Sequence, residues 1–128
     1  MSSFTIFLED EILNRYFRDT TVYVPVAQLY IALYSVAPTE SGGGTELSGG
    51  GYTRMPVTFT APVAGVIENT ADVTFPTATG APWSIAAFAI VDALVDPSNM
   101  LGYKATSATI AVGNRARFPA GGLTVSLD

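Results

Sequence analysis

Hydrophobic positions recur with two different periods along the chain, a helical one near the start and a strand-like one afterwards. In residues 3–18 the apolar residues Leu8, Ile12 and Tyr16 recur every four positions. Leu13 and Phe17 form a second row beside them. This spacing predicts a helix over residues 3–18, because it gathers apolar side chains on one side. Ser2 or Ser3 would be its N-cap, since a serine hydroxyl can accept a hydrogen bond from the first turn.

Beyond residue 19 the hydrophobic period is two, which is typical of strands. Within residues 28–35, for example, Leu29, Ile31 and Leu33 point one way and the intervening residues the other. Turn-forming residues separate further predicted strands over residues 52–59, 71–76, 83–94, 100–105, 108–112 and 122–127. Pro56 indicates a sheet edge or a bulge for the strand that contains it.

Many short strands separated by turn residues indicate an antiparallel architecture. We therefore predict a mainly β fold, an antiparallel β-sandwich or barrel with one N-terminal α-helix. Residues 1–20 would form a helical arm and residues 21–128 a single β-domain.

A glycine-rich loop over residues 39–51 contains two runs of three glycines. It does not fit a phosphate-binding loop, because Gly51 is followed by Tyr52 and a predicted strand in place of Lys, Ser or Thr and a helix. We predict a connecting loop, in which Thr45 to Tyr52 becomes ordered only against a partner chain.

Charged residues are scarce, at 13% of the 128 residues, which is about half the usual share. Part of the surface is therefore expected to contact other subunits, since the cores of protein interfaces are depleted of charge. The net charge of −5 and the scattered bases argue against nucleic acid as a partner. No apolar run approaches a membrane span, and we expect no signal peptide, because the N-terminal residues lack a basic region followed by an apolar run. The absence of cysteine suits assembly in a cytoplasm.

Candidate catalytic chemistry is sparse. The chain has no histidine and no cysteine, and its one lysine, Lys104, lacks a preceding Ser-x-x-Lys pattern. Asp92 and Asp96 could share a calcium ion only if the loop between them curls, and no dense pattern of oxygen ligands supports this. We expect no enzymatic activity, no cofactor and no metal.

Several segments together resemble a family of small tailed-bacteriophage proteins that are commonly labelled tail fibre or minor structural proteins. The resemblance covers about residues 22–128 and rests on QLYIALYSVAP, GGGTELSGGGYTRMPVTF, ENTADVTFPTATG, a tryptophan, AFAIVDA and GLTVSLD. Its most specific part is Gly44-Thr45-Glu46 followed by Gly51-Tyr52-Thr53-Arg54. The resemblance implies a structural role in the virion, with assembly in the host cytoplasm.

Within that class the chain is short for a receptor-reaching fibre, so a capsid decoration (cement) protein is our first hypothesis. A tail fibre or tail/portal adaptor protein is the second. A glycan-binding module and a small glycan hydrolase stay open as functions of other classes.

The expected partners are other copies of the chain, as a homotrimer or another homo-oligomer, and the major capsid protein or tail proteins. Intersubunit contacts are predicted for the apolar side of the helix and for the glycine-rich loop: Phe4, Phe7, Leu8, Ile12, Gly44, Thr45, Glu46, Tyr52 and Arg54.

Overall fold

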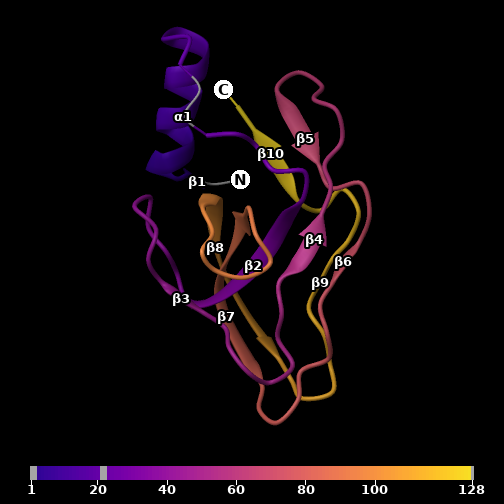
Figure 1. The fold of residues 1–128 in the computed structure, drawn as a ribbon. Helices are drawn as coiled ribbons and strands as arrows, with labels where there is room; N and C mark the ends of the chain where they lie inside the picture. The colour runs from indigo at the N-terminus through magenta and orange to yellow at the C-terminus, as the bar shows by residue number, and fades with distance from the viewer. Residues whose placement is uncertain (1–2, 21–22, 128) are drawn as a thin grey trace.

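The computed structural model describes residues 3–20 and 23–127, and within them the fold is mainly β, with antiparallel sheets and one helix (Figure 1). The predicted fold class is confirmed, and of its two alternatives no closed barrel forms among these residues. The elements are β1 Ser3–Phe4, α1 Ile6–Phe17, β2 Leu29–Val36, β3 Thr45–Glu46, β4 Met55–Val57, β5 Val66–Glu68, β6 Val73–Thr74, β7 Trp83–Val91, β8 Met100–Ile110, β9 Arg117–Phe118 and β10 Thr124–Ser126.

The main sheet has the order β1-β8-β7-β2-β3, and β4 also pairs with β2. Its centre is the antiparallel pair β2 and β7, in which Tyr30 lies opposite Val91 and Tyr34 opposite Ala87. Two separate ribbons, β5 with β10 and β6 with β9, lie beside it in Figure 1.

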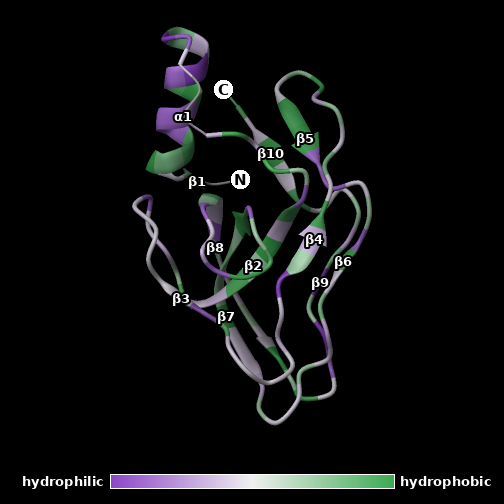
Figure 2. Cartoon of the chain, in the orientation of Figure 1, coloured by the Kyte–Doolittle hydropathy of each residue, from purple (hydrophilic) through white to green (hydrophobic). Residues whose placement is uncertain are grey.

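Both faces of the main sheet are buried at its centre, where Figure 2 shows green, hydrophobic segments along β2 and β7. One face carries the larger side chains and packs with the two ribbons: Ile31, Leu33, Ile85, Phe88 and Ile90, with Val73, Phe75, Trp83 and Leu123. The opposite face is lined mainly by small residues: Ala32, Ala87 and Ala89, with Tyr34 and Val91. A register shift between Ile85 and Ala87 keeps Ile85 and Phe88 on the same face, although they are three positions apart.

The helix begins later than the sequence predicts, because Ser3–Phe4 pairs as a strand with Tyr103 and Gly102 of β8. Its N-cap is Thr5, whose hydroxyl oxygen accepts a hydrogen bond from the Leu8 amide. Ser3 as N-cap is therefore wrong, and Ser2 lies outside the described residues. The Thr5 hydroxyl also donates to the Met100 carbonyl oxygen, which ties the start of α1 to β8.

Several strand predictions differ from the structure at their boundaries. The strands expected over residues 100–105 and 108–112 form one element, β8, because β7 pairs with it along most of its length. Pro56 does lie on an edge, since β4 pairs with β2 alone. Within the described part of the chain, no helix is long and apolar enough to cross a membrane.

Candidate interaction surfaces

The residues predicted to make intersubunit contacts fall into two groups in the structure. Phe4 in β1 and Phe7, Leu8 and Ile12 on α1 are half-buried. Gly44 and Thr45 are exposed, Glu46 and Tyr52 are half-buried, and Arg54 is buried. The two groups are thus different surfaces, and the second is largely explained by contacts inside the chain.

Arg54 is the centre of a buried polar cluster, with only 5% of its side chain exposed. Its Nε and Nη2 donate to the two carboxylate oxygens of Glu46 in β3, at 2.9 and 2.8 Å. Nη2 also donates to Asp96 at 3.0 Å, and Nη1 donates to the Ala93 carbonyl and the Ser98 hydroxyl, at 2.9 and 3.1 Å. One side chain therefore joins β3, the start of β4 and the loop that follows β7.

Tyr52 completes this cluster on the side of the core. Its hydroxyl accepts a hydrogen bond from the Leu33 amide at 3.0 Å and donates to Glu46. Burial, and then the bond to Glu46, raises the pKa of Tyr52 well above its usual range. The hydrogen bonds to Glu46 raise the pKa of Arg54, against the opposing effect of burial. At neutral pH the cluster is thus a neutral phenol beside a guanidinium–carboxylate pair.

This cluster gives a structural role to the most specific part of the sequence resemblance, since Glu46, Tyr52 and Arg54 all belong to it. Contacts inside the chain hold Thr45 to Tyr52 in place, in contrast to the expectation that a partner chain would be needed. Gly44 also has an internal reason for its identity: its φ is +75°, and an added Cβ would lie 2.6 Å from the Val36 carbonyl oxygen. The intersubunit role of these residues stays a prediction.

The outer side of α1 is the most conspicuous apolar surface. None of its twelve residues is buried, and Tyr16 and Phe17 are 76% and 78% exposed. Helices of globular proteins normally bury an apolar stripe against the rest of the protein. The apolar residues on the outer side of α1 are not buried in this way. Its exposed side chains mark α1 as a candidate contact with another subunit.

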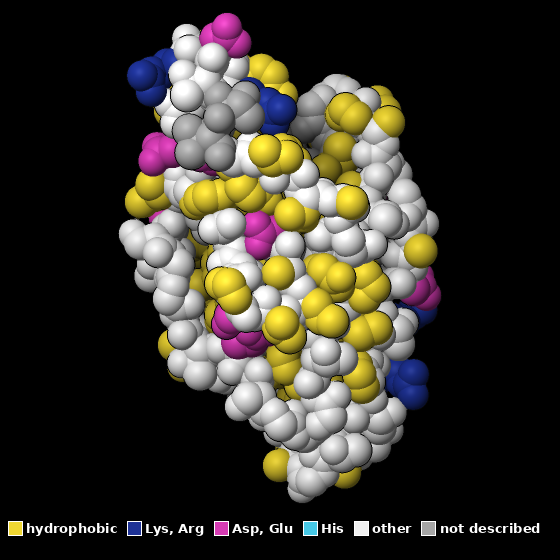
Figure 3. Space-filling view, viewed as in Figure 1, with side chains coloured by type: hydrophobic (Ala, Val, Ile, Leu, Met, Phe, Trp, Pro, Cys, Tyr) yellow, Lys and Arg dark blue, Asp and Glu magenta, His cyan; other side chains and the backbone are white. Residues whose placement is uncertain are grey.

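An apolar groove continues from α1 onto the sheet. Two adjoining recesses of about 240 and 150 Å³ share Leu8, Leu29 and Leu101 as lining residues. Ile12 and Tyr16 line the larger recess, and Phe4, Phe59 and Val125 line the smaller. In the space-filling view, hydrophobic side chains gather below the helix (Figure 3). We call the surface formed by these residues the apolar groove.

Tyr23 closes one end of the apolar groove. Its hydroxyl donates to Asp92 at 3.0 Å, its amide donates to Glu11 at 3.0 Å, and its ring meets Phe7 edge-on at 5.0 Å. Burial first, and then the bond to Asp92, raises the pKa of Tyr23 to about 12. The carboxylate of Asp92 also accepts two hydrogen bonds from Asn99.

Asp92 and Asp96 therefore accept hydrogen bonds from different residues, Asp92 from Tyr23 and Asn99 and Asp96 from Arg54 and Ser98, and do not converge on one cation. Burial raises the pKa of Asp92, but the hydrogen bonds from Asn99 and Tyr23 outweigh it and leave this pKa below its usual value. Hydrogen bonds from Ser98 and Arg54 lower the pKa of Asp96. Across residues 3–20 and 23–127, no group of three or more acidic residues could hold a metal ion.

Sequence reasoning missed several residues of these surfaces. Asp96 was considered only as a possible calcium ligand and as part of a turn, Ser98 was assigned no site role, and their link to Arg54 spans more than forty positions. Leu29 and Leu101 were assigned to strands without a surface role. A spacing pattern reports local structure, and these contacts are long-range.

Comparison with known proteins gives one family. The family model described as Podophage GP4 fiber I protein gp80 matches residues 3–126, which span every helix and strand described above. A search of curated proteins finds no match.

Proposed function

Because the chain belongs to the family described as Podophage GP4 fiber I protein gp80, a family of phage fibre structural proteins, we propose that it is a subunit of a tailed-phage fibre that self-associates through α1. The observation that carries this proposal is the exposure of Tyr16 and Phe17 on a helix with no buried residue. Packing α1 and the apolar groove against another copy would remove that apolar surface from water.

The charge along α1 supports another copy as the partner. The acidic residues Glu9 and Asp10 lie in its first half, and Arg15 and Arg18 lie at its end. Two copies of α1 packed antiparallel would bring the acidic half of each helix beside the basic end of the other. A two-fold contact of this kind is self-complementary, as symmetric interfaces require.

The surroundings of the groove agree with an interface. Most of its lining residues are apolar, and the charged residues Glu11 and Arg15 line it as well. An apolar centre with a polar rim is the usual anatomy of a protein–protein contact. Such a fibre contact works by burial of surface and involves no chemical step.

Sedimentation velocity across a wide concentration range would test self-association. The double substitution Tyr16→Ser and Phe17→Ser is expected to leave a monomer at concentrations where the wild type associates. Val63→Ser is the matched control, because Val63 is equally exposed but lies in the turn before β5. A wild type that stays monomeric, or a double variant that associates as the wild type does, would refute contact through α1.

Location in the particle is a separate test. Immunogold labelling of intact particles with antibodies against this chain is expected to mark the fibres. Label distributed over the capsid lattice would replace the fibre role with the decoration role that the sequence analysis placed first. Label at the portal end would favour an adaptor.

A further inference from the structure

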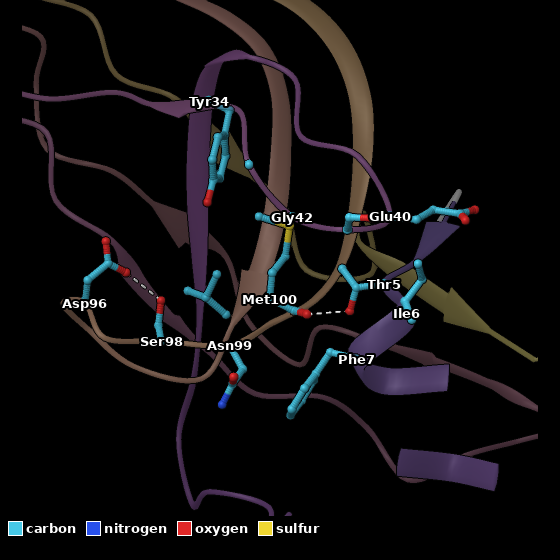
Figure 4. Close-up of a pocket in the computed structure, with 13 residues that line it drawn as sticks. Thr5, Ile6, Phe7, Tyr34, Glu40, Gly42, Asp96, Ser98, Asn99 and Met100 are labelled. Atoms are coloured by element: carbon cyan, nitrogen blue, oxygen red, sulfur yellow. Dashed lines mark hydrogen bonds between the residues drawn. The ribbon is translucent and has the colours of Figure 1, made fainter. Parts of the chain in front are cut away.

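Another recess lies at the start of α1 and shares no lining residue with the apolar groove. It has a volume of about 510 Å³ and is bordered by the start of α1, by residues 40–43 and by the loop that leads into β8 (Figure 4). Tyr34 of β2 and Val91 of β7 contribute from the alanine-lined face of the sheet. This volume falls within the range of about 300–1,000 Å³ that is usual for small-molecule sites.

Hydrogen bonds connect the segments that border this recess. The Ile6 amide donates to the Glu40 carbonyl oxygen at 2.9 Å, which joins α1 to the glycine-rich loop. Thr5 joins α1 to Met100, and Arg54 holds Asp96 and Ser98 on the opposite side. The recess is therefore formed before any ligand arrives, which lowers the entropic cost of binding.

Tyr34 supplies an unused polar group. The residue is only 7% exposed, and within residues 3–20 and 23–127 its hydroxyl has no hydrogen-bond partner. Every fully buried side-chain nitrogen or oxygen in this part of the chain has a partner, so the Tyr34 hydroxyl keeps its contact with the open recess. In Figure 4 it points toward the middle of the lining residues. Burial is the main cause that raises the pKa of Tyr34, so the hydroxyl is neutral and can both donate and accept.

The charge of the lining selects among ligands. Asp96 stands at the rim, and its hydrogen bonds with Arg54 and Ser98 both use Oδ1, which leaves Oδ2 as an acceptor. The Glu40 carboxylate points away from the recess in Figure 4, and the Arg54 guanidinium is already bonded to Glu46, Asp96, Ser98 and Ala93. An anion would meet a carboxylate, and the described residues that line the recess include no lysine or arginine to offset it. A ligand with neutral hydroxyl groups would satisfy both Tyr34 and Asp96.

We propose that this recess binds a neutral saccharide. The Asp96 carboxylate and the Tyr34 hydroxyl bond to sugar hydroxyls, and Phe7, which also lines the recess, packs against an apolar face of the ring. This site goes beyond the proposed fibre role and does not depend on it, because none of its lining residues belongs to the apolar groove.

The test is a titration of the ¹⁵N-labelled full chain, followed by amide chemical shifts. The probes are glucose, galactose, N-acetylglucosamine and lactose, with N-acetylneuraminic acid as the anionic counterpart. Saturable shifts are expected at the amides of Gly42, Gly43 and Asn99 with at least one neutral sugar, and none with the anionic one. The absence of saturable shifts at these amides for all four neutral sugars would overturn the proposal.

Two tyrosine variants separate the proposed contact from general effects. Tyr34→Phe removes only a hydroxyl that has no partner in the described chain, so it should fold normally and bind the sugar about five- to tenfold more weakly. Tyr30→Phe is the matched control, because Tyr30 lies on the same strand and packs with the same face but does not line the recess. Equal affinities of wild type and Tyr34→Phe would refute the role of the hydroxyl. Stronger binding of N-acetylneuraminic acid than of the neutral sugars would refute the assigned ligand class.

Discussion

Replacing Arg54 with methionine would remove the guanidinium from the buried cluster while keeping most of the volume of the side chain. The perturbation leaves Glu46 with Tyr52 as its remaining side-chain partner, and it frees the Ala93 carbonyl and the Ser98 hydroxyl from Arg54. The ion pair is bidentate and Arg54 is almost fully buried. Its loss is therefore destabilising, because it leaves the Glu46 carboxylate without a positive charge beside it.

The expected loss can be worked from the exposure of each partner. Removing one member of a buried ion pair costs about 3–5 kcal/mol. Asp96 is 76% exposed, so its share is no more than about 1 kcal/mol, because water solvates the released carboxylate. Glu46 is partly accessible and keeps Tyr52, which places the total near the lower end. We expect Arg54→Met to lower the free energy of unfolding by about 3 kcal/mol, a large part of the total for a domain of this size.

Urea denaturation monitored by the fluorescence of Trp83 would measure this loss. Arg117→Met is the matched control: Arg117 donates to Asp72 at the same 2.8 Å, but both side chains are about half exposed, so at most about 1 kcal/mol is expected. Glu46→Gln and the double variant with Arg54→Met complete a double-mutant cycle, in which the double variant should lose less than the sum of the two. Equal losses for Arg54→Met and Arg117→Met would refute the argument from burial.

Three further predictions concern the core and the loop. Gly44→Ala should cost at least about 2 kcal/mol and Gly43→Ala about 1 kcal/mol in urea denaturation. Both have a positive φ, but only at Gly44 would the new Cβ lie 2.6 Å from backbone, so equal costs would contradict the steric reason. Phe75→Ala should cost about 3–5 kcal/mol in the same assay, because Phe75 is fully buried and stacks on Tyr52. Burial holds the phenols of Tyr23 and Tyr52 protonated in the folded state, while the unfolded chain ionises near pH 10. The free energy of unfolding should therefore fall as pH rises above about 10, by up to about 1.4 kcal/mol per pH unit for each tyrosine, and a flat profile from pH 10 to 12 would contradict this.

The sequence predicts the long elements well, because each has enough residues to show a period. Residues 28–35 alternate clearly, and β2 follows within one residue at each end. The elements β3, β5 and β9 have only two or three residues, so no alternation can reveal them, and their pairing with distant segments creates them. The prediction of the N-cap was wrong for a similar reason. Ser3 and Thr5 both have a hydroxyl that can cap a helix, and the pairing of β1 with β8 makes Thr5 the cap.

The candidate sites follow the same division between local and long-range information. Glu46, Tyr52 and Arg54 stood out in the sequence as a motif, but only the structure shows that they bond to one another and to Asp96. The exposed apolar side of α1 was readable from its amphipathic pattern together with its surplus of large side chains. The recess that we propose binds a saccharide could not be predicted from the sequence, because its lining residues come from five separate stretches of the chain.

The Arg54 cluster links the stability of the fold to the geometry of that recess. Arg54 ties β3 and the loop after β7 together, and that loop carries Asp96, Ser98 and Asn99 into the lining. On the opposite wall, Thr5 and Ile6 fasten the start of α1 to Met100 and Glu40. A partner that packs on the outer side of α1 would thus contact a helix whose first turn is already hydrogen-bonded to the sheet and to the glycine-rich loop. A fibre contact through the apolar groove and a ligand in the recess can then coexist, because the two surfaces share no lining residue and hydrogen bonds inside the chain hold the first turn of α1.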